Sequence, residues 1–172
     1  MKKAKILAIC FVMAFLAGCA SQKQNQDISI DQTSRGVEIL SSNSILFDSG
    51  KYQIKPDGLA FIQQVANLLK TKTKNDVLIE GYTDNVGSVE LNQQLSELRA
   101  LTVMKALVDN GIDKRRIKPR GFGMSNPIAN NDTESGRQRN RRTDIIILGE
   151  RKENLGNSPF DNILGSIKKL FG

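Results

Sequence analysis

The sequence predicts an α/β protein of the α+β kind, a two-layer sandwich in which helices pack on one face of a mixed β-sheet. Two observations carry this prediction. Short apolar segments typical of strands alternate with longer segments of helical periodicity, and the last apolar segment, Asp144–Leu148, is a strong strand candidate. Because each strand and helix must bury its apolar side, this order favours helices packed against a sheet.

The first predicted elements are two short strands, Val37–Leu40 and Ser44–Phe47, separated by a Ser-Ser-Asn turn. A helix is expected from Pro56, because proline and the following Asp57 suit the first turn of a helix. The apolar residues of this helix recur at helical spacing and define one buried face: Leu59, Ile62, Val65, Ala66 and Leu69.

A long helix is predicted over Val89–Asn110 and is ended by Gly111, since glycine is favoured just after a helix. The other elements expected in this half are two strands, a short helix and the final strand: Asp76–Glu80, Ile117–Gly121, Glu134–Asn140 and Asp144–Leu148.

The long helix is expected to bury a stripe made of Leu91, Leu95, Leu98, Thr102 and Ala106. Asn92, Ser96 and Arg99 fall within about 60° of arc beside that stripe. A cation at the border of a core usually has a fixed partner, and Asp84 in the preceding turn is the natural candidate. The pair is either a salt bridge that holds the loop to the helix or a binding site.

Residues 1–18 are predicted to be a lipoprotein signal peptide. Three lysines among the first five residues precede an apolar run that is too short to span a membrane but suits a secretory signal. The run ends in Leu-Ala-Gly-Cys, which resembles a bacterial lipobox, and the resemblance implies cleavage before Cys19 and a lipid on that cysteine. The alternative is cleavage elsewhere, with Cys19 an ordinary residue.

Residues 19–36 are predicted to be the lipidated cysteine and a flexible tether, because Ala20–Arg35 is polar. Such a segment spans roughly 55 Å at full extension and about 20–25 Å as a coil, so the domain would stay near its membrane. By resemblance to sorted lipoproteins, alanine rather than aspartate at position 20 favours the outer membrane, with the domain facing the periplasm.

Composition narrows the chemistry of the mature chain. Cys10 leaves with the signal, Cys19 carries the lipid, and the chain has no histidine, so no metal site and no cofactor are predicted. Loss of the signal lysines lowers the formal net charge from +7 to +4, which suggests an anionic partner. Export and the scarcity of aromatics favour an envelope surface over nucleic acid.

Three segments, "FDSGKYQIKPDG", "IEGYTDNVGSVELNQQLSELRA" and "GRQRNRRTDI", resemble the OmpA-like peptidoglycan-binding domain in order and spacing. The resemblance assigns residues 37–150 to this domain and implies the OmpA C-terminal-like fold. Tyr82, Leu98 and Thr143 depart from residues common in the family. Because the chain has neither a β-barrel segment nor a stator helix before the domain, peptidoglycan-associated lipoproteins are the nearest architecture.

The resemblance also implies a binding site for diaminopimelate in the peptidoglycan stem peptide. Asp84 would take the ammonium of this zwitterion and Arg99 its carboxylate, which a planar guanidinium fits as a fork. The remaining candidate binding residues are Asn92, Leu95, Arg142, Phe47 and Asp48. Arg137, Arg139 and Arg141 are expected on a solvated face, with only Arg142 approaching the site.

Three functions follow from these patterns. The leading one is a non-catalytic module, lipid-anchored in the outer membrane, that tethers this membrane to the cell wall. A second is a scaffold in which wall binding positions an assembly of envelope proteins. A third, less favoured, is a wall hydrolase that uses carboxylates such as Glu80 and Asp84.

Residues 151–172 are predicted to be a C-terminal tail with a short amphipathic helix. Ser158 and Pro159 suit a helix start, and six apolar residues follow at helical spacing: Phe160, Ile163, Leu164, Ile167, Leu170 and Phe171. This helix either packs on the domain or contacts the membrane surface or a partner.

Overall fold

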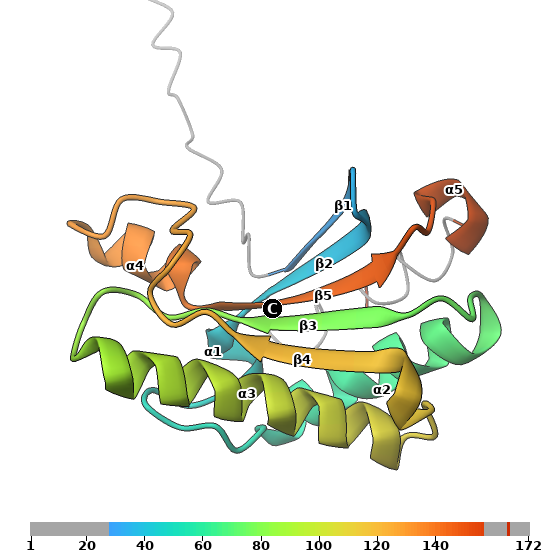
Figure 1. The fold of residues 1–172 in the computed structure, drawn as a ribbon, viewed down its shortest axis with the longest axis horizontal. Helices are drawn as coiled ribbons and strands as arrows, with labels where there is room; N and C mark the ends of the chain where they lie inside the picture. Colours follow the sequence, from blue (N-terminus) through green and yellow to red (C-terminus); the bar gives the residue numbers. More distant parts are fainter. Residues whose placement is uncertain (1–27, 157–164, 166–172) are drawn as a thin grey trace, which may run out of the picture.

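A computed structural model of the chain describes residues 28–156 and residue 165. It contains a five-stranded mixed sheet with helices packed against one face (Figure 1). The elements in chain order are β1 (Ile28–Thr33), β2 (Gly36–Ser42), α1 (Asn43–Leu46), α2 (Pro56–Thr71), β3 (Val77–Gly81), α3 (Val89–Asp109), a 3₁₀ turn (Lys114–Arg116), β4 (Ile117–Gly121), α4 (Glu134–Asn140), β5 (Arg142–Leu148) and α5 (Lys152–Leu155).

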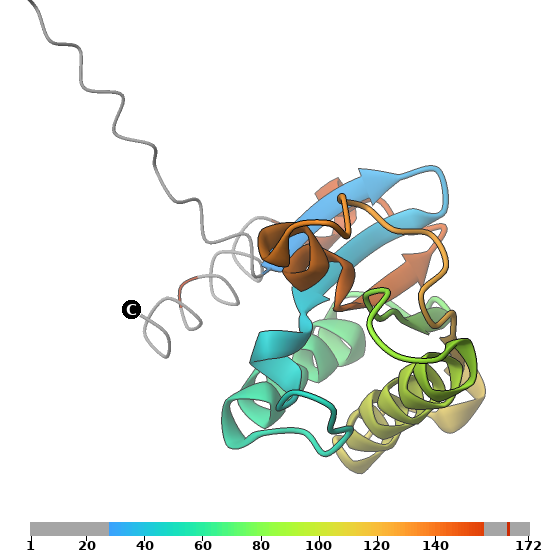
Figure 2. The same ribbon diagram turned by 90° about the vertical axis from the view of Figure 1, so that its left-hand side faces the viewer.

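The strand order in the sheet is β1-β2-β5-β3-β4. β3 and β4 are parallel, and the other three neighbouring pairs are antiparallel. A parallel pair needs a crossover connection, which α3 supplies. α2 and α3 lie beneath the sheet when it is viewed from its end (Figure 2). The two-layer fold predicted from the sequence is therefore confirmed.

The core lies between the sheet and the two long helices. Ile39, Ile145 and Ile147 of the central strands are fully buried. They belong to one apolar cluster with residues of α2 and α3 that include Phe61, Ile62, Leu69, Val103 and Leu107. Burial of this apolar surface, at about 25 cal/mol per Å², holds the two layers together. On α2 the predicted face is correct except at Leu59, which is 50% exposed.

The predicted tether is too long, because Ile28–Thr33 form the edge strand β1. Its isoleucines alternate with polar residues, and Ile30 pairs with Ile39 of β2 and is buried. The sequence did not predict this strand because only one of its sides contacts the core, so polar residues occupy the other side. The described part of the domain therefore begins with this strand. Residues 1–27, which contain the predicted signal and Cys19, lie outside the described part of the chain.

Ser44–Phe47 is not a strand, because Asn43–Leu46 form the single turn α1. The Ser42 hydroxyl caps this turn by accepting a hydrogen bond from the Ser44 amide. A Ser-Asn pair before an apolar run signals a helix start as well as a turn, and the capping interaction prevails here.

The buried face of α3 differs from the predicted one. Leu91 is 64% and Leu98 40% exposed, whereas Asn92, Ser96 and Arg99 are buried. The N-terminal half of α3 packs on the ends of β3 and β4 rather than on the apolar centre of the sheet. A Cβ atom on Gly81 would lie 2.3 Å from the Ser96 carbonyl oxygen, and one on Gly121 2.4 Å from the Glu97 nitrogen. The absence of these side chains lets the helix backbone contact the strands.

The C-terminal part begins with the short helix α5, whose Leu155 is fully buried in the core cluster. The domain thus extends beyond the predicted boundary at residue 150. The predicted amphipathic helix of the tail lies outside the described residues. None of the helices described is long and apolar enough to cross a membrane.

Candidate functional site

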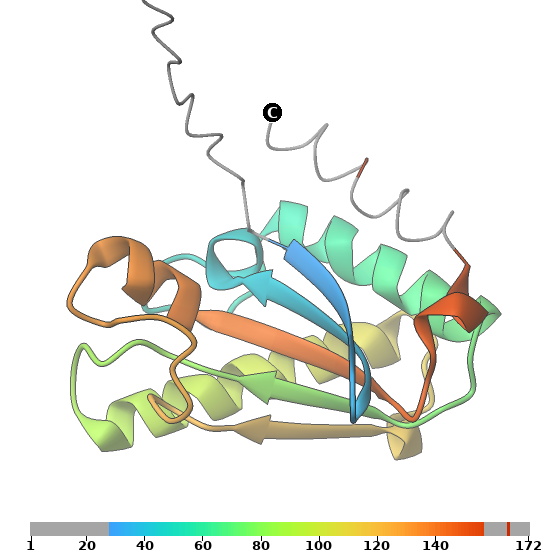
Figure 3. The ribbon, with the colours of Figure 1, turned by 90° about the horizontal axis from the view of Figure 1, so that it is seen from above.

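The candidate site lies at one end of the sheet, where the loop after β3, the start of α3, α4 and the loop after α1 meet. This end faces the viewer in Figure 2, and α4 lies near the β3–α3 loop in the view from above (Figure 3). Asp84 lies in the β3–α3 loop and is 7% exposed. Its Oδ1 accepts a hydrogen bond of 3.0 Å from the Val86 amide, and its Oδ2 one of 2.6 Å from Arg141 Nη1. The carboxylate is thus held in one orientation.

Arg99 projects from the buried side of α3 and is only 3% exposed. Its Nε donates to the Lys51 carbonyl oxygen at 2.9 Å, and its guanidinium carbon lies 5.2 Å from the centre of the Phe47 ring. Within residues 28–156 no carboxylate oxygen lies within 4.0 Å of its nitrogens. Burial lowers the pKa of Arg99 to about 10, against the opposing effect of the nearby Asp84 charge.

The expected Asp84–Arg99 ion pair is therefore replaced by a pair between Asp84 and Arg141. Arg141 was expected on a solvated face, but it contacts Asp84 through Nη1 and Glu134 of α4 through Nη2, each at 2.6 Å. These bonds raise the pKa of Arg141 despite its partial burial. Two acids and two arginines thus converge at this end of the sheet.

Arg142 points to the other face of the sheet and does not contact Asp84 or Arg99. Its Nε donates to Asp144 Oδ2 at 3.0 Å, and its guanidinium lies 3.7 Å above the Tyr82 ring. Side chains alternate along a strand, so Arg142 shares a face with Asp144 and not with the core residue Ile145. If the alternation of Asp144–Leu148 is extended toward the N-terminus, it places Arg142 on the face of Asp144. The same alternation places Arg141 on the opposite face, the side of Ile145.

The other candidate residues differ in their burial and in their contacts. Asn92 is buried and donates to the Val86 carbonyl oxygen at 2.8 Å, which ties the loop to the helix. Leu95 is partly buried on α3. The ring of Phe47 is buried beneath Arg99, whereas Asp48 is exposed and faces Lys51 at 3.6 Å. The Phe47–Lys51 segment therefore contacts Arg99 at both of its ends.

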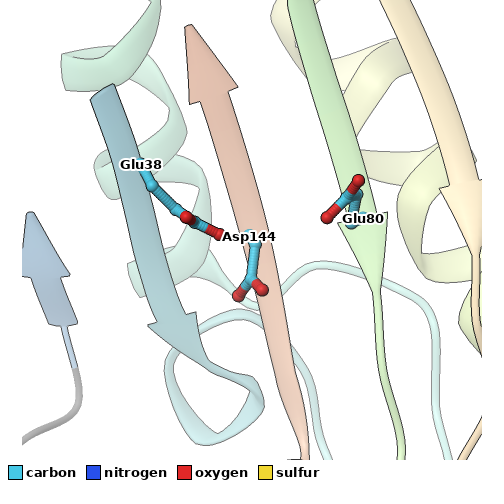
Figure 4. A group of neighbouring side chains, drawn as sticks. All are labelled: Glu38, Glu80 and Asp144. Atoms are coloured by element: carbon cyan, nitrogen blue, oxygen red, sulfur yellow. The ribbon is translucent and has the colours of Figure 1, made fainter. Parts of the chain in front are cut away.

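A separate group of acids lies on the sheet face away from α2 and α3. Ligand oxygens of Glu38, Glu80 and Asp144 lie within 4.8 Å of one another (Figure 4). Arg35 donates to Glu38 and Glu80, and Arg142 to Asp144, so guanidinium groups already act as their cations. Burial raises the pKa of Asp144 to about 7, which disfavours its charged form.

The comparisons with known proteins agree with a small envelope-binding domain. Residues 46–141, more than half of the chain, match the OmpA family. The chain belongs to the OmpA family, a non-catalytic, peptidoglycan-binding family of the cell envelope. The hydrolase alternative fails accordingly, and Glu80 is buried under bonds from Arg35 and Tyr82.

Two relatives are named as lipoproteins. The chain is 38% identical over 120 residues to the probable lipoprotein YiaD of Escherichia coli K12, a match that covers 70% of this chain and 55% of YiaD. It is 33% identical over 155 residues to the outer-membrane lipoprotein YfiB of Pseudomonas aeruginosa, which covers 84% and 92% of the two chains. The match thus spans just over half of YiaD but almost all of YfiB.

Solved structures show the same fold. The cell wall anchor of the T6SS from Pseudomonas aeruginosa aligns with a TM-score of 0.65 at 26% identity, over 72% of this chain and 88% of that one. The peptidoglycan-associated lipoprotein of Burkholderia pseudomallei aligns with a TM-score of 0.55 at 31% identity, over 59% and 86%. The OmpA C-terminal-like fold expected from the sequence is thereby confirmed.

Proposed function

We propose that this chain is anchored in the outer membrane by a lipid on Cys19 and binds diaminopimelate in the peptidoglycan stem peptide, which tethers the membrane to the wall. Peptidoglycan binding follows from the family. The anchor is supported by the Leu-Ala-Gly-Cys segment and by the lipoprotein names of YiaD and YfiB.

The observation that carries the ligand assignment is the environment of Arg99. A buried guanidinium without a carboxylate partner is costly, because the charge has lost its hydration. A ligand carboxylate at its two terminal nitrogens would supply that partner in bidentate geometry. Asp84, whose charge is felt at Arg99, would accept the adjacent ammonium. The free end of diaminopimelate carries both groups on one carbon.

Pelleting with purified peptidoglycan tests this proposal. The full chain in mild detergent is sedimented with the wall, alone and as the Arg99→Ala and Asp84→Asn variants. Both changes are expected to move the protein from the pellet to the supernatant. Arg139→Ala is the matched control, because Arg139 is an exposed arginine on α4. Equal pelleting of all four proteins, with circular dichroism showing an intact fold, would refute the assignment of the site.

A scaffold that positions an envelope assembly is a second candidate function. It is favoured by the outer side of α3, where Leu91, Leu98 and Leu101 are 64%, 40% and 45% exposed. Scattered apolar surface residues are ordinary, but a row of leucines on one helix suits protein contact. Replacing the three leucines with glutamine should leave wall pelleting unchanged and remove envelope proteins from a pull-down if the scaffold function holds.

A further inference from the structure

The ion pairs around Asp84 bear on which ligands the site can prefer. Asp84 is the only acid that the proposed function assigns to the ligand ammonium, yet Arg141 already donates to its Oδ2. A carboxylate neutralised by a guanidinium attracts a second cation only weakly. The site therefore needs a second negative charge near Arg141. This charge would neutralise part of the guanidinium, so that Asp84 can still attract the ligand ammonium.

Glu134 supplies a second negative charge, which Arg141 and Arg137 share. Its Oε1 accepts from Arg141 Nη2 at 2.6 Å, and its Oε2 accepts from Arg137 Nε at 2.9 Å. It lies in the first turn of α4, which Thr133 caps by accepting a hydrogen bond from the Gly136 amide. Arg141 is thus bound by two carboxylates from two different elements, α4 and the β3–α3 loop.

The charges of Arg141 and Arg99 act within the same site. Besides the lowering effect of burial, the negative charge of Asp84 raises the pKa of Arg99 and the positive charge of Arg141 lowers it. If Glu134 were neutral, Arg141 would be compensated by Asp84 alone. Less negative charge would then remain for an ammonium, while the guanidinium of Arg99 would still take a carboxylate.

We propose that Glu134 is a specificity-determining residue that makes the site prefer an amino-acid zwitterion over a simple carboxylate, by sharing Arg141 with Asp84. This inference rests on the proposed binding of diaminopimelate and assigns a role to a residue outside the direct contacts. Glu134 acts through Arg141 and Asp84, so it is a positioning residue and need not touch the ligand.

The test compares two seven-carbon dicarboxylic acids that differ in their amino groups, diaminopimelate and pimelate. Titration calorimetry with the full chain in mild detergent gives the ratio of the two affinities. Glu134→Gln keeps the shape of the side chain and removes its charge. Because the Glu134 side chain is 66% exposed, the ratio should fall by about two- to fivefold, the range typical of a solvent-screened ion pair.

Two control variants separate this role from general effects of charge and structure. Glu153→Gln removes an acid that is also 66% exposed and paired with an arginine at 2.6 Å, but on α5, and should leave the ratio unchanged. Glu134→Asp should keep most of the preference. A merely structural Glu134 would change both affinities together, and the ratio would stay as in the wild type.

The outcomes distinguish this inference from the function on which it rests. A wild-type preference for diaminopimelate that survives in Glu134→Gln would overturn the role of Glu134 and leave the proposed function standing. A wild-type protein that binds both acids equally, or neither, would overturn both. A ratio lowered in Glu134→Gln but not in Glu153→Gln supports the inference.

Discussion

At the scale of single residues, the proposed site depends on Arg99, a buried arginine that has no carboxylate partner within residues 28–156. Arg99 was selected from its place in the sequence motif, and its burial agrees with a functional role. Its expected partner was wrong because Arg141, the residue that directly precedes β5, pairs with Asp84 instead. Helical and strand periodicity indicate the face of a side chain, but they do not indicate which of two nearby cations pairs with a carboxylate.

Arg99→Lys separates geometry from charge at this position. Lysine keeps the positive charge but has no planar fork for a carboxylate. Loss of one charge-assisted hydrogen bond should weaken wall binding by about tenfold or more, close to the effect of Arg99→Ala. Binding is measured by sedimentation with purified peptidoglycan. Wild-type binding by the lysine variant would show that only diffuse charge matters at position 99.

At the scale of elements, most of the fold was predictable. The long helix, the three later strands and the short helix α4 lie within one or two residues of their predicted ranges. β1 was missed because an edge strand with one contacting side has a weak apolar signal. The predicted buried face of α3 was wrong because the close approach of the helix to Gly81 and Gly121 turns polar residues toward the sheet. There the Ser96 hydroxyl accepts a hydrogen bond of 2.8 Å from the Gly123 amide.

The central strand β5 carries a pH-dependent contribution to stability. Asp144 is buried beside Glu38 and Glu80, faces Arg142, and lies one strand from Arg35. Its pKa in the folded chain is about 7, above the ordinary value of 3.8, so the folded state holds a proton that the unfolded state releases. The contribution of Asp144 to the free energy of unfolding is fully present below about pH 4 and is lost as the pH rises through about 7.

Asp144→Asn should remove this contribution while keeping an acceptor for Arg142. The difference in free energy of unfolding between the variant and the wild type should shift in favour of the variant by a few kcal/mol between pH 4 and pH 7.5. Urea denaturation at four pH values measures it. A difference that stays constant across this range would mean that Asp144 does not titrate there.

At the scale of the whole molecule, the proposed lipid on Cys19 joins a wall-binding domain to the outer membrane. The segment between Cys19 and β1 is shorter than the predicted tether, since β1 begins at Ile28. Eight residues, 20–27, span roughly 30 Å at full extension. With the proposed lipid on Cys19, the proposed binding end of the sheet would reach the wall from close to the membrane surface.

Cys19→Ser tests the anchor. Without the thiol, no lipid can be attached, so the protein should fractionate as an uncleaved precursor or as a soluble periplasmic species. Membrane fractionation with detection by antibody measures this. A variant that is processed normally and still sediments with the outer membrane would contradict the lipoprotein assignment.

Deletion of Asn157–Gly172 tests the two roles predicted for the amphipathic tail, while α5 and its buried Leu155 are kept. If the tail packs on the domain, the melting temperature should fall by several degrees. If it contacts membrane or a partner, stability and wall pelleting should be unchanged and liposome or partner binding lost. An unchanged result in all of these measurements would exclude both roles.

The central claim is that Arg99 binds the carboxylate that distinguishes diaminopimelate from lysine in the stem peptide. The most direct measurement is pelleting of the full chain with two purified walls, one with diaminopimelate and one with lysine at this position. The wild type should bind the diaminopimelate wall at least about tenfold more tightly than the lysine wall, because a lysine stem leaves the buried guanidinium without its partner. Arg99→Ala should abolish the difference. Equal binding of the wild type to both walls would contradict the account.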